Sequence, residues 1–243
     1  MLYILRLIGL GIYFVLVSLL GIFICLVRPF HPDNTRVFGR IFSWGGAAIL
    51  GIKIRVKNYE SLRDVGPCVY VVNHQDNLDL FVTGRVVPKR TVTLGKKSLR
   101  WLPFFGQLYW LAGNIFIDRG NRSSSKMTMS ESTRALTEKN TSIWFFAEGH
   151  RNRGRNMLPF KKGAFKMAIE AGVPVVPICV SSYARHIDLH SLKGSQAEIK
   201  ILPPISTDHL TDKDTDTILQ QCWDQMKATI DAMDEEIYKD AIQ

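Results

Sequence analysis

The distribution of apolar and polar positions separates an apolar N-terminal part from the rest of the chain. Leu7–Val27 is a run of 21 residues without a charged side chain. As a helix it would be about 32 Å long, close to the hydrocarbon thickness of a bilayer. A shorter apolar run, Ile41–Ile52, follows a proline-containing turn over Arg28–Asn34. We expect residues 1–52 to form a helical membrane anchor. Either the first helix spans the bilayer, or both helices form a hairpin within one leaflet.

After Ile52 the pattern changes to short β-branched or aromatic segments that alternate with helical stretches. The predicted buried strands are CVYVVN, TVTLG, NIFID, SIWFFAE and VVPICVSS, with IKIRVKNY as a half-exposed strand and AEIKILPPI as a late one. The predicted helices are Leu78–Val87, Ser123–Glu138, Lys162–Ala171 and an amphipathic helix after Asp212. This alternation predicts an α/β domain over residues 53–243, with a mostly parallel central sheet flanked by helices. Pro174 and Pro177 indicate that their strand begins there or lies at a sheet edge.

Charge is distributed unevenly along the chain, which carries a formal net charge of +9. Two windows, Leu80–Ile117 and Gly149–Ile169, contain basic residues and no acidic ones. Such windows suit phosphate, nucleic acid or an anionic membrane surface. No nucleic-acid recognition motif is found, and the apolar N-terminus favours lipid. Basic residues after the first apolar run place the domain in the cytoplasm if that helix spans. The four cysteines are far apart in apolar surroundings, which indicates buried free thiols.

The stretch VVNHQDNLDLF, residues 71–81, places a histidine at the end of a predicted buried strand. Catalytic groups in parallel α/β sheets gather at the carboxyl ends of strands. Asp79, five residues after His74, could bond one imidazole nitrogen and leave the other free to take a proton from a substrate hydroxyl. A structural histidine with Asp76 as a helix cap is the alternative. A metal site of His74, Asp76 and Asp79 is disfavoured, because no further histidine–carboxylate cluster completes it.

Charged residues also follow three other predicted strands. They are Lys96 and Lys97, then Asp118 and Arg119, and then Glu148 with Gly149 and Arg151. Arg151 could pair with Glu148 or bind a phosphate through two hydrogen bonds. Each group alone is compatible with a solvated loop. Together they predict one rim of the sheet that carries a base and several phosphate-binding cations.

Four blocks in this order resemble the glycerolipid acyltransferase family. The blocks are N-H-x4-D at Asn73, His74 and Asp79, then GNIFIDR at Gly113–Arg119, FAEGHR at Phe146–Arg151, and the V-P run at Val173–Pro177. The likeness covers about residues 73–205. Two positions depart from the family pattern, Asp76 where serine is common and His150 where threonine is common. Asp76 could compete with Asp79 for His74, and His150 could add a pH-dependent charge beside a phosphate.

The resemblance implies transfer of a fatty acyl group from acyl-CoA or an acyl carrier protein thioester. The acceptor would be the sn-2 hydroxyl of lysophosphatidic acid, and the product phosphatidic acid. By the same resemblance, His74 would be the general base and Asp79 its orienting partner. Arg119, Glu148, Gly149 and Arg151 would shape the acceptor site, and Lys96 or Lys97 would add a phosphate contact.

The resemblance also implies an enzyme at the bacterial inner membrane, with its active site on the cytoplasmic side. No bound cofactor or metal is expected. Two other interpretations remain open from the sequence. The acceptor could be a different lysophospholipid, or the chain could be a catalytically silent module that binds anionic lipid. The silent module is disfavoured because His74 and Asp79 are both present.

Overall fold

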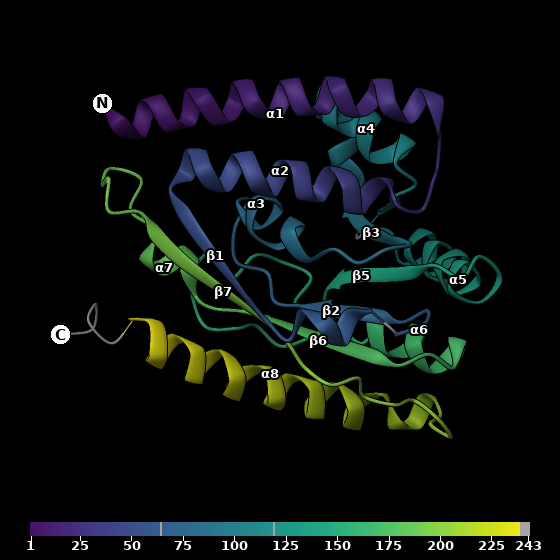
Figure 1. The fold of residues 1–243 in the computed structure, drawn as a ribbon. Coiled ribbons are helices and arrows are strands. Elements are labelled where there is room, and N and C mark those ends of the chain that lie inside the picture. The colour runs from purple at the N-terminus through teal and green to yellow at the C-terminus, as the bar shows by residue number, and fades with distance from the viewer. Residues whose placement is uncertain (64, 119, 239–243) are drawn as a thin grey trace.

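A seven-stranded sheet lies between two layers of helices in the computed structural model, which describes residues 1–63, 65–118 and 120–238 (Figure 1). One face of the sheet is covered by α1 (Leu2–Val27), α2 (Asn34–Leu50), α3 (Asp79–Thr83) and α4 (Phe105–Leu111). The other face is covered by α5 (Arg122–Glu138), α6 (Gly163–Ala171) and α8 (Thr215–Tyr238). The remaining elements of the described residues are a short helix, α7 (Tyr183–His186), and four 3-10 turns: η1 (Tyr59–Leu62), η2 (Gly84–Val86), η3 (Lys97–Trp101) and η4 (Asp212–Asp214).

The sheet is parallel except at one pair of strands, which confirms the predicted α/β class. Its order is β1 (Ile52–Lys57), β7 (Ser195–Ile201), β6 (Val175–Val180), β2 (Val69–Val72), β5 (Ser142–Phe146), β3 (Thr91–Lys96) and β4 (Ile115–Ile117). Among these strands, only β6 and β7 pair antiparallel. Because β2 lies at the centre, between β5 and β6, the residues that follow it emerge at the middle of one sheet edge.

The prolines of the fourth block do not place their strand at a sheet edge, so that alternative was wrong, whereas Pro174 does mark the start of the strand. β6 is fully buried and pairs with both β2 and β7. Pro174 lies just before the strand. Pro177 accepts a hydrogen bond from Leu202 and lies opposite the point where the chain leaves β7. Because Leu202 lies just beyond β7, Pro177 is at the end of the regular β6–β7 ladder, where one missing N–H is tolerated.

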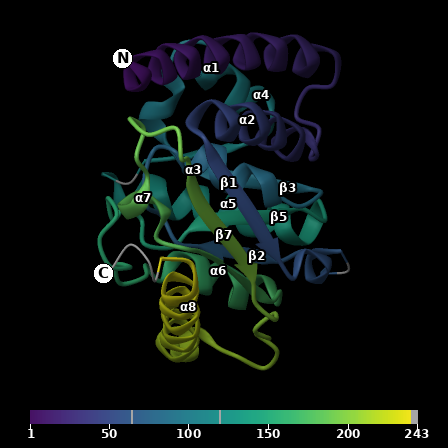
Figure 2. The ribbon, with the colours of Figure 1, turned by 60° about the vertical axis from the view of Figure 1, so that its left-hand side comes forward.

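Alternating side chains of the central strands supply two separate hydrophobic cores. Tyr70 and Val72 pack with α1, α2 and α4, whereas Val69 and Val71 pack with α6 and α8 on the other side. This period of two is what a strand buried on both faces requires. Figure 2 shows the two helical layers on opposite sides of the sheet. The four cysteines are buried and free, as expected.

The N-terminal helix lies flat against the body instead of projecting from it (Figures 1 and 2). Near its start, the Arg6 guanidinium donates to the carbonyl oxygen of Asp188 at 3.4 Å. In its middle, the Tyr13 hydroxyl donates to the carbonyl of Ile41 in α2. Just after its end, the Phe30 N–H donates to the carbonyl of Leu111 in α4 at 2.8 Å. Among the described residues, α1 is the helix long and apolar enough to cross a membrane.

Candidate active site

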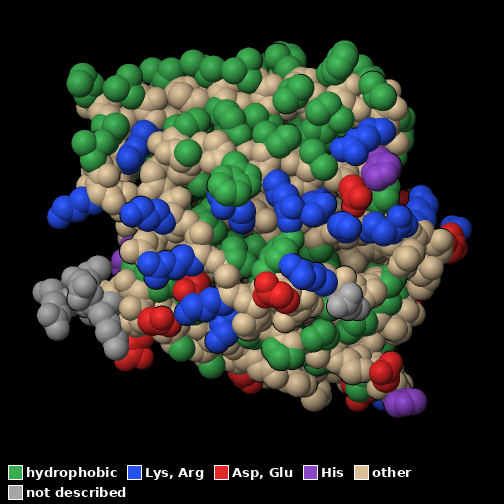
Figure 3. Space-filling view, in the orientation of Figure 1, with side chains coloured by type: hydrophobic (Ala, Val, Ile, Leu, Met, Phe, Trp, Pro, Cys, Tyr) green, Lys and Arg blue, Asp and Glu red, His purple; other side chains and the backbone are tan. Residues whose placement is uncertain are grey.

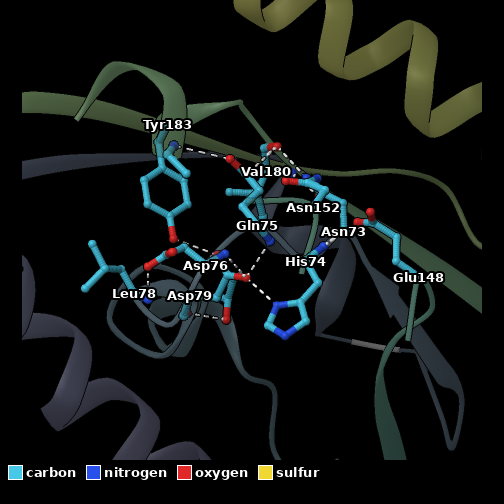
Figure 4. A network of polar contacts seen from close by, with 12 residues as sticks. Asn73, His74, Gln75, Asp76, Leu78, Asp79, Glu148, Asn152, Val180 and Tyr183 are labelled. Atoms are coloured by element: carbon cyan, nitrogen blue, oxygen red, sulfur yellow. Dashed lines mark hydrogen bonds and ion pairs between the residues drawn. The ribbon is translucent and has the colours of Figure 1, made fainter. Parts of the chain in front are cut away.

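The loop that carries His74 is fixed to the end of β6 through the residues on either side of the histidine. The Asn73 side chain, 3% exposed, donates to the Val180 carbonyl at 2.9 Å and accepts from the Val180 N–H at 2.8 Å. The Gln75 side chain donates to the Ser181 carbonyl at 2.7 Å. These bonds leave His74 between two residues tied to the end of β6. The position of the imidazole is therefore set by the backbone on both sides (Figure 4).

His74 and Asp79 form the pair that the sequence predicts. Nδ1 of His74 lies 2.5 Å from Oδ2 of Asp79, and the ring stacks on Phe146 with 4.1 Å between centroids. The other ring nitrogen points away from the carboxylate, and His74 lines a cavity (Figure 4). The Asp79 carboxylate holds the Nδ1–H tautomer and leaves Nε2 able to accept a proton.

Asp79 is itself held by two further donors. The Gln75 N–H donates to Oδ2 at 2.8 Å, and the Tyr183 hydroxyl donates to Oδ1 at 2.6 Å. Tyr183 has no exposed surface, and burial beside Asp79 raises its pKa well above the usual value, so the phenol keeps its proton. Sequence reasoning did not find this residue. It lies 104 positions from Asp79, and only the order of β2 and β6 in the sheet brings the two together.

Asp76 does not compete for the imidazole. Its Oδ1 accepts the N–H of Leu78 at 3.1 Å, which caps the turn before α3. Asp76 is therefore not the helix cap of the alternative interpretation, because the N-cap residue of α3 is Leu78 and has no side-chain capping bond. In the part of the chain that the structure describes, no group of three or more histidine, cysteine, aspartate or glutamate side chains could hold a metal ion.

Glu148 does not pair with Arg151, so that possibility is wrong. Its carboxylate is 1% exposed and accepts the N–H of His74 at 2.6 Å and that of Leu158 at 2.7 Å. Burial raises the pKa of Glu148 to about 7, against the lowering effect of these hydrogen bonds. Glu148 therefore joins the histidine loop to the loop after β5. The Asn152 N–H strengthens this connection by donating to the His74 carbonyl at 2.9 Å.

Some of the predicted acceptor-site residues line the cavity mouth, and one of the predicted cations forms an ion pair instead. Lys96, Gly149 and Arg151 line the cavity with His74, and so does His150. Lys97 instead pairs with Asp118 at 3.1 Å, and this contact lowers the pKa of the Asp118 carboxyl. Gly149 has a φ of 74°, a left-handed conformation that glycine adopts without strain. Arg119 lies outside the described residues.

The whole cavity, from the mouth at His74 to its apolar interior, has a volume of about 940 Å³. Its apolar walls come from the helices above the sheet: Leu10 and Phe14 of α1, Phe38 and Phe42 of α2, and Phe105 and Leu108 of α4. A polar mouth with a base and cations therefore opens into an interior that fits hydrocarbon. This combination defines a site that can activate a hydroxyl group beside a bound lipid chain.

The chain belongs to the acyltransferase family, because residues 53–181 match the family model described as Acyltransferase. It is 40% identical, over 98% of its length and 96% of the relative's, to the 1-acyl-sn-glycerol-3-phosphate acyltransferase of Escherichia coli. The Haemophilus influenzae protein of the same name is also 40% identical, over 93% of both chains. The alpha form from Mus musculus is 36% identical over 81% of this chain and 70% of its own.

The fold is also that of a solved structure. The crystal structure of the 1-acyl-sn-glycerophosphate acyltransferase from Thermotoga maritima superposes with a TM-score of 0.74. It covers 96% of this chain and 94% of its own, at 18% sequence identity. This similarity extends over the helices above the sheet as well as the α/β domain, since both lie within the matched length.

Proposed function

We propose that this acyltransferase moves a fatty acyl group from a thioester to the sn-2 hydroxyl of 1-acyl-sn-glycerol-3-phosphate and so makes phosphatidic acid. The observation that carries the proposal is the His74–Asp79 pair at the mouth of the apolar cavity. The names of the bacterial relatives support the acceptor. Acyl-CoA and acyl carrier protein are the two donor classes that we propose, and either one is a substrate, not a bound cofactor.

His74 would act as the general base. Its Nε2 takes the proton of the acceptor hydroxyl as that oxygen attacks the thioester carbonyl carbon. The tetrahedral intermediate then collapses, the carbon–sulfur bond breaks, and the imidazolium returns the proton to the departing thiolate. A thioester is already activated, so this sequence requires neither a covalent enzyme intermediate nor a metal ion. General base catalysis contributes about 10²–10⁴-fold, and positioning adds to it.

The acceptor phosphate would bind to the cations at the mouth of the cavity. Arg151 is exposed there and can form two charge-assisted hydrogen bonds with a phosphate. Lys96 approaches the same mouth from the end of β3. Gly149 contributes to the acceptor site through the left-handed turn of its backbone at the cavity mouth. Glu148 acts indirectly, by holding the loops in place, and Lys97 is the weaker candidate because Asp118 already neutralises it.

The membrane would hold this protein through one leaflet. The outward side of α1 is apolar along its length, and η3, α4 and the segment between them add exposed Trp101, Leu102, Phe104 and Trp110. The upper part of the molecule in Figure 3 is correspondingly apolar, and Lys and Arg side chains gather in a band below it. A helix bonded to the body at its start, middle and end fits an interfacial position better than a crossing one. We place it on the cytoplasmic face of a bacterial inner membrane.

The test is acyl transfer by the purified full chain in mixed micelles. Wild type should convert 1-acyl-sn-glycerol-3-phosphate with acyl-CoA or acyl carrier protein, and His74→Ala should lose about 10³-fold or more in kcat while its thermal melt is retained. His150→Ala, which changes the same cavity mouth, should keep most of the activity. Full activity in folded His74→Ala would refute the base assignment. A preference for another lysophospholipid would show that the proposed acceptor is wrong. If no donor gave turnover, the silent lipid-binding module would be favoured.

A further inference from the structure

Two arginines meet on the side of α2 that faces away from the catalytic cavity. Arg40 donates to the Tyr59 hydroxyl, and its guanidinium carbon lies 5.9 Å from the centroid of that ring. Arg85 in η2 donates to Ser43 at 3.3 Å and lies over the Trp44 ring, 3.8 Å from its centroid. Arg40 and Trp44 are one helical turn apart, so both guanidinium groups lie beside the same stretch of α2.

The backbone is built so that Arg85 reaches this helix. Gly39 of α2 and Gly84 of η2 touch, and a side chain at Gly84 would collide with the carbonyl oxygen of Gly39. Arg85 follows Gly84 directly, and its guanidinium therefore lies against the next turn of α2. The arrangement of the two arginines is thus a consequence of close packing between α2 and η2.

Neither arginine has an acidic partner within the described residues. Both are half-buried, and the buried Nε of Arg40 has no hydrogen-bond partner. Burial, together with the charge of Arg40, lowers the pKa of Arg85. Two half-buried like charges without a counter-charge are unfavourable by themselves. A bound anion would reverse that cost.

The pair lies at the depth where phospholipid headgroups are expected, if α1 occupies one leaflet as proposed above. One leaflet contributes about 15 Å of hydrocarbon, and a helix with its side chains is about 10 Å across. The far side of the second helix layer therefore lies near the headgroups. Trp44 is 65% exposed there, as is typical of interfacial aromatic side chains. Arg40, Trp44, Tyr59 and Arg85 do not line the catalytic cavity.

We propose that Arg40 and Arg85, with Trp44 and Tyr59, bind the phosphodiester headgroup of an anionic membrane phospholipid. The guanidinium groups would contact the phosphate oxygens, the Tyr59 hydroxyl would remain bonded to Arg40, and Trp44 would lie among the glycerol and upper acyl carbons. The site is separate from the acceptor site, so it holds a lipid that is not consumed. Its occupancy would stabilise the protein and its seating in the leaflet.

The test measures thermal stability of the full chain in neutral detergent micelles with added dioctanoyl phosphatidylglycerol. The lipid should raise Tm of wild type, and Arg40→Gln/Arg85→Gln should need roughly tenfold more lipid for the same rise. Lys53→Gln/Arg55→Gln is the matched control, because it removes two exposed cations from the adjacent β1 and should keep the response. Arg151→Ala should also keep it, which separates this site from the acceptor site.

Two further arms identify what binds. Dioctanoyl phosphatidylcholine and inorganic phosphate should each raise Tm much less than phosphatidylglycerol does. An unchanged lipid response in Arg40→Gln/Arg85→Gln would overturn the site. An equal response to phosphate would show a small-anion site instead of a lipid site, and an equal response to phosphatidylcholine would show that the acyl chains alone bind. The assay measures Tm and not acyl transfer, so a negative result would not bear on the proposed reaction. The activity of Arg40→Gln/Arg85→Gln in neutral micelles should equal that of wild type.

Discussion

The two sides of the cavity mouth are built in opposite ways. On the base side, Asp79 is 3% exposed and its carboxylate accepts bonds from His74, Gln75 and Tyr183. On the anion side, Lys96 and Arg151 are exposed and form no ion pair with any described residue. A general base must hold its geometry before the substrate arrives, whereas phosphate-binding cations gain their partner from the substrate itself. The comparison predicts that substitutions on the base side lower kcat, whereas substitutions on the anion side raise the KM for the acceptor.

The largest effect is expected for Asp79→Asn. The amide cannot stabilise an imidazolium, and it can bond Nδ1 in a way that favours the wrong tautomer. We expect kcat to fall by about 10²–10⁴-fold with little change in the acceptor KM. Steady-state kinetics in mixed micelles measure both. Asp76→Asn is the control, because Asp76 lines the same cavity but caps only the Leu78 N–H. Comparable losses in the two variants would refute the pairing role.

Arg151→Ala tests the anion side. Loss of a charge-assisted contact with the phosphate should raise the acceptor KM by about 10–100-fold and change kcat much less. Arg155→Ala is a matched control, since Arg155 is also exposed on this loop but does not line the cavity. An acceptor that lacks the phosphate should show no difference between wild type and Arg151→Ala. A fall in kcat alone would place Arg151 in the chemistry instead of in acceptor binding.

The base-side pair was predictable because it is local. His74 follows a strand of unambiguous pattern, and Asp79 is five residues away, so one turn of chain brings them together. Tyr183 and Glu148 show where such reasoning stops. Tyr183 reaches Asp79 only because β6 is the neighbour of β2, and strand order is not visible in strand pattern. Arg151 was one candidate partner for Glu148, but two backbone N–H groups bond to this carboxylate instead.

The helical segments show the same limit. The apolar runs predicted two N-terminal helices correctly, but they did not decide between a spanning helix and one packed on the body. The position of the first helix depends on contacts with distant residues, such as the Asp188 and Leu111 carbonyl groups. Likewise, Pro174 and Pro177 were predicted to mark a strand start or a sheet edge because proline lacks an N–H. Pro174 does precede β6, but Pro177 lies inside this central strand, at the end of its regular ladder with β7.

Glu148→Gln tests the connection between the two sides through pH-dependent stability. The pKa of about 7 lies above the usual value near 4.5, so the folded state binds the proton more tightly. The stabilising effect of the protonated carboxyl is complete below about pH 4.5 and is lost as pH rises through 7, by up to about 3 kcal/mol. The glutamine side chain of the variant does not titrate. The advantage of wild type over the variant should therefore shrink between pH 5 and 8.

Urea unfolding in micelles at several pH values measures this difference in the free energy of unfolding. Glu170→Gln is the control, because it makes the same change at an exposed carboxyl group. A constant gap between wild type and Glu148→Gln would show that Glu148 ionises normally in the folded protein. Activity should fall together with stability in Glu148→Gln, since Glu148 holds the His74 backbone and does not line the cavity.

The smallest effect is expected for Tyr183→Phe, which removes one hydrogen bond from a buried network. Without the Tyr183 hydroxyl, the Asp79 carboxylate loses one of the contacts that fix its orientation toward Nδ1 of His74. We expect kcat to fall by roughly three- to tenfold with KM unchanged, because the base is less well positioned. Tyr238→Phe is the control, because that buried hydroxyl bonds Ser181 and the Gln196 carbonyl but not Asp79. Equal losses of Tm in the two variants, with no fall in kcat for Tyr183→Phe, would show that Tyr183 acts only in packing.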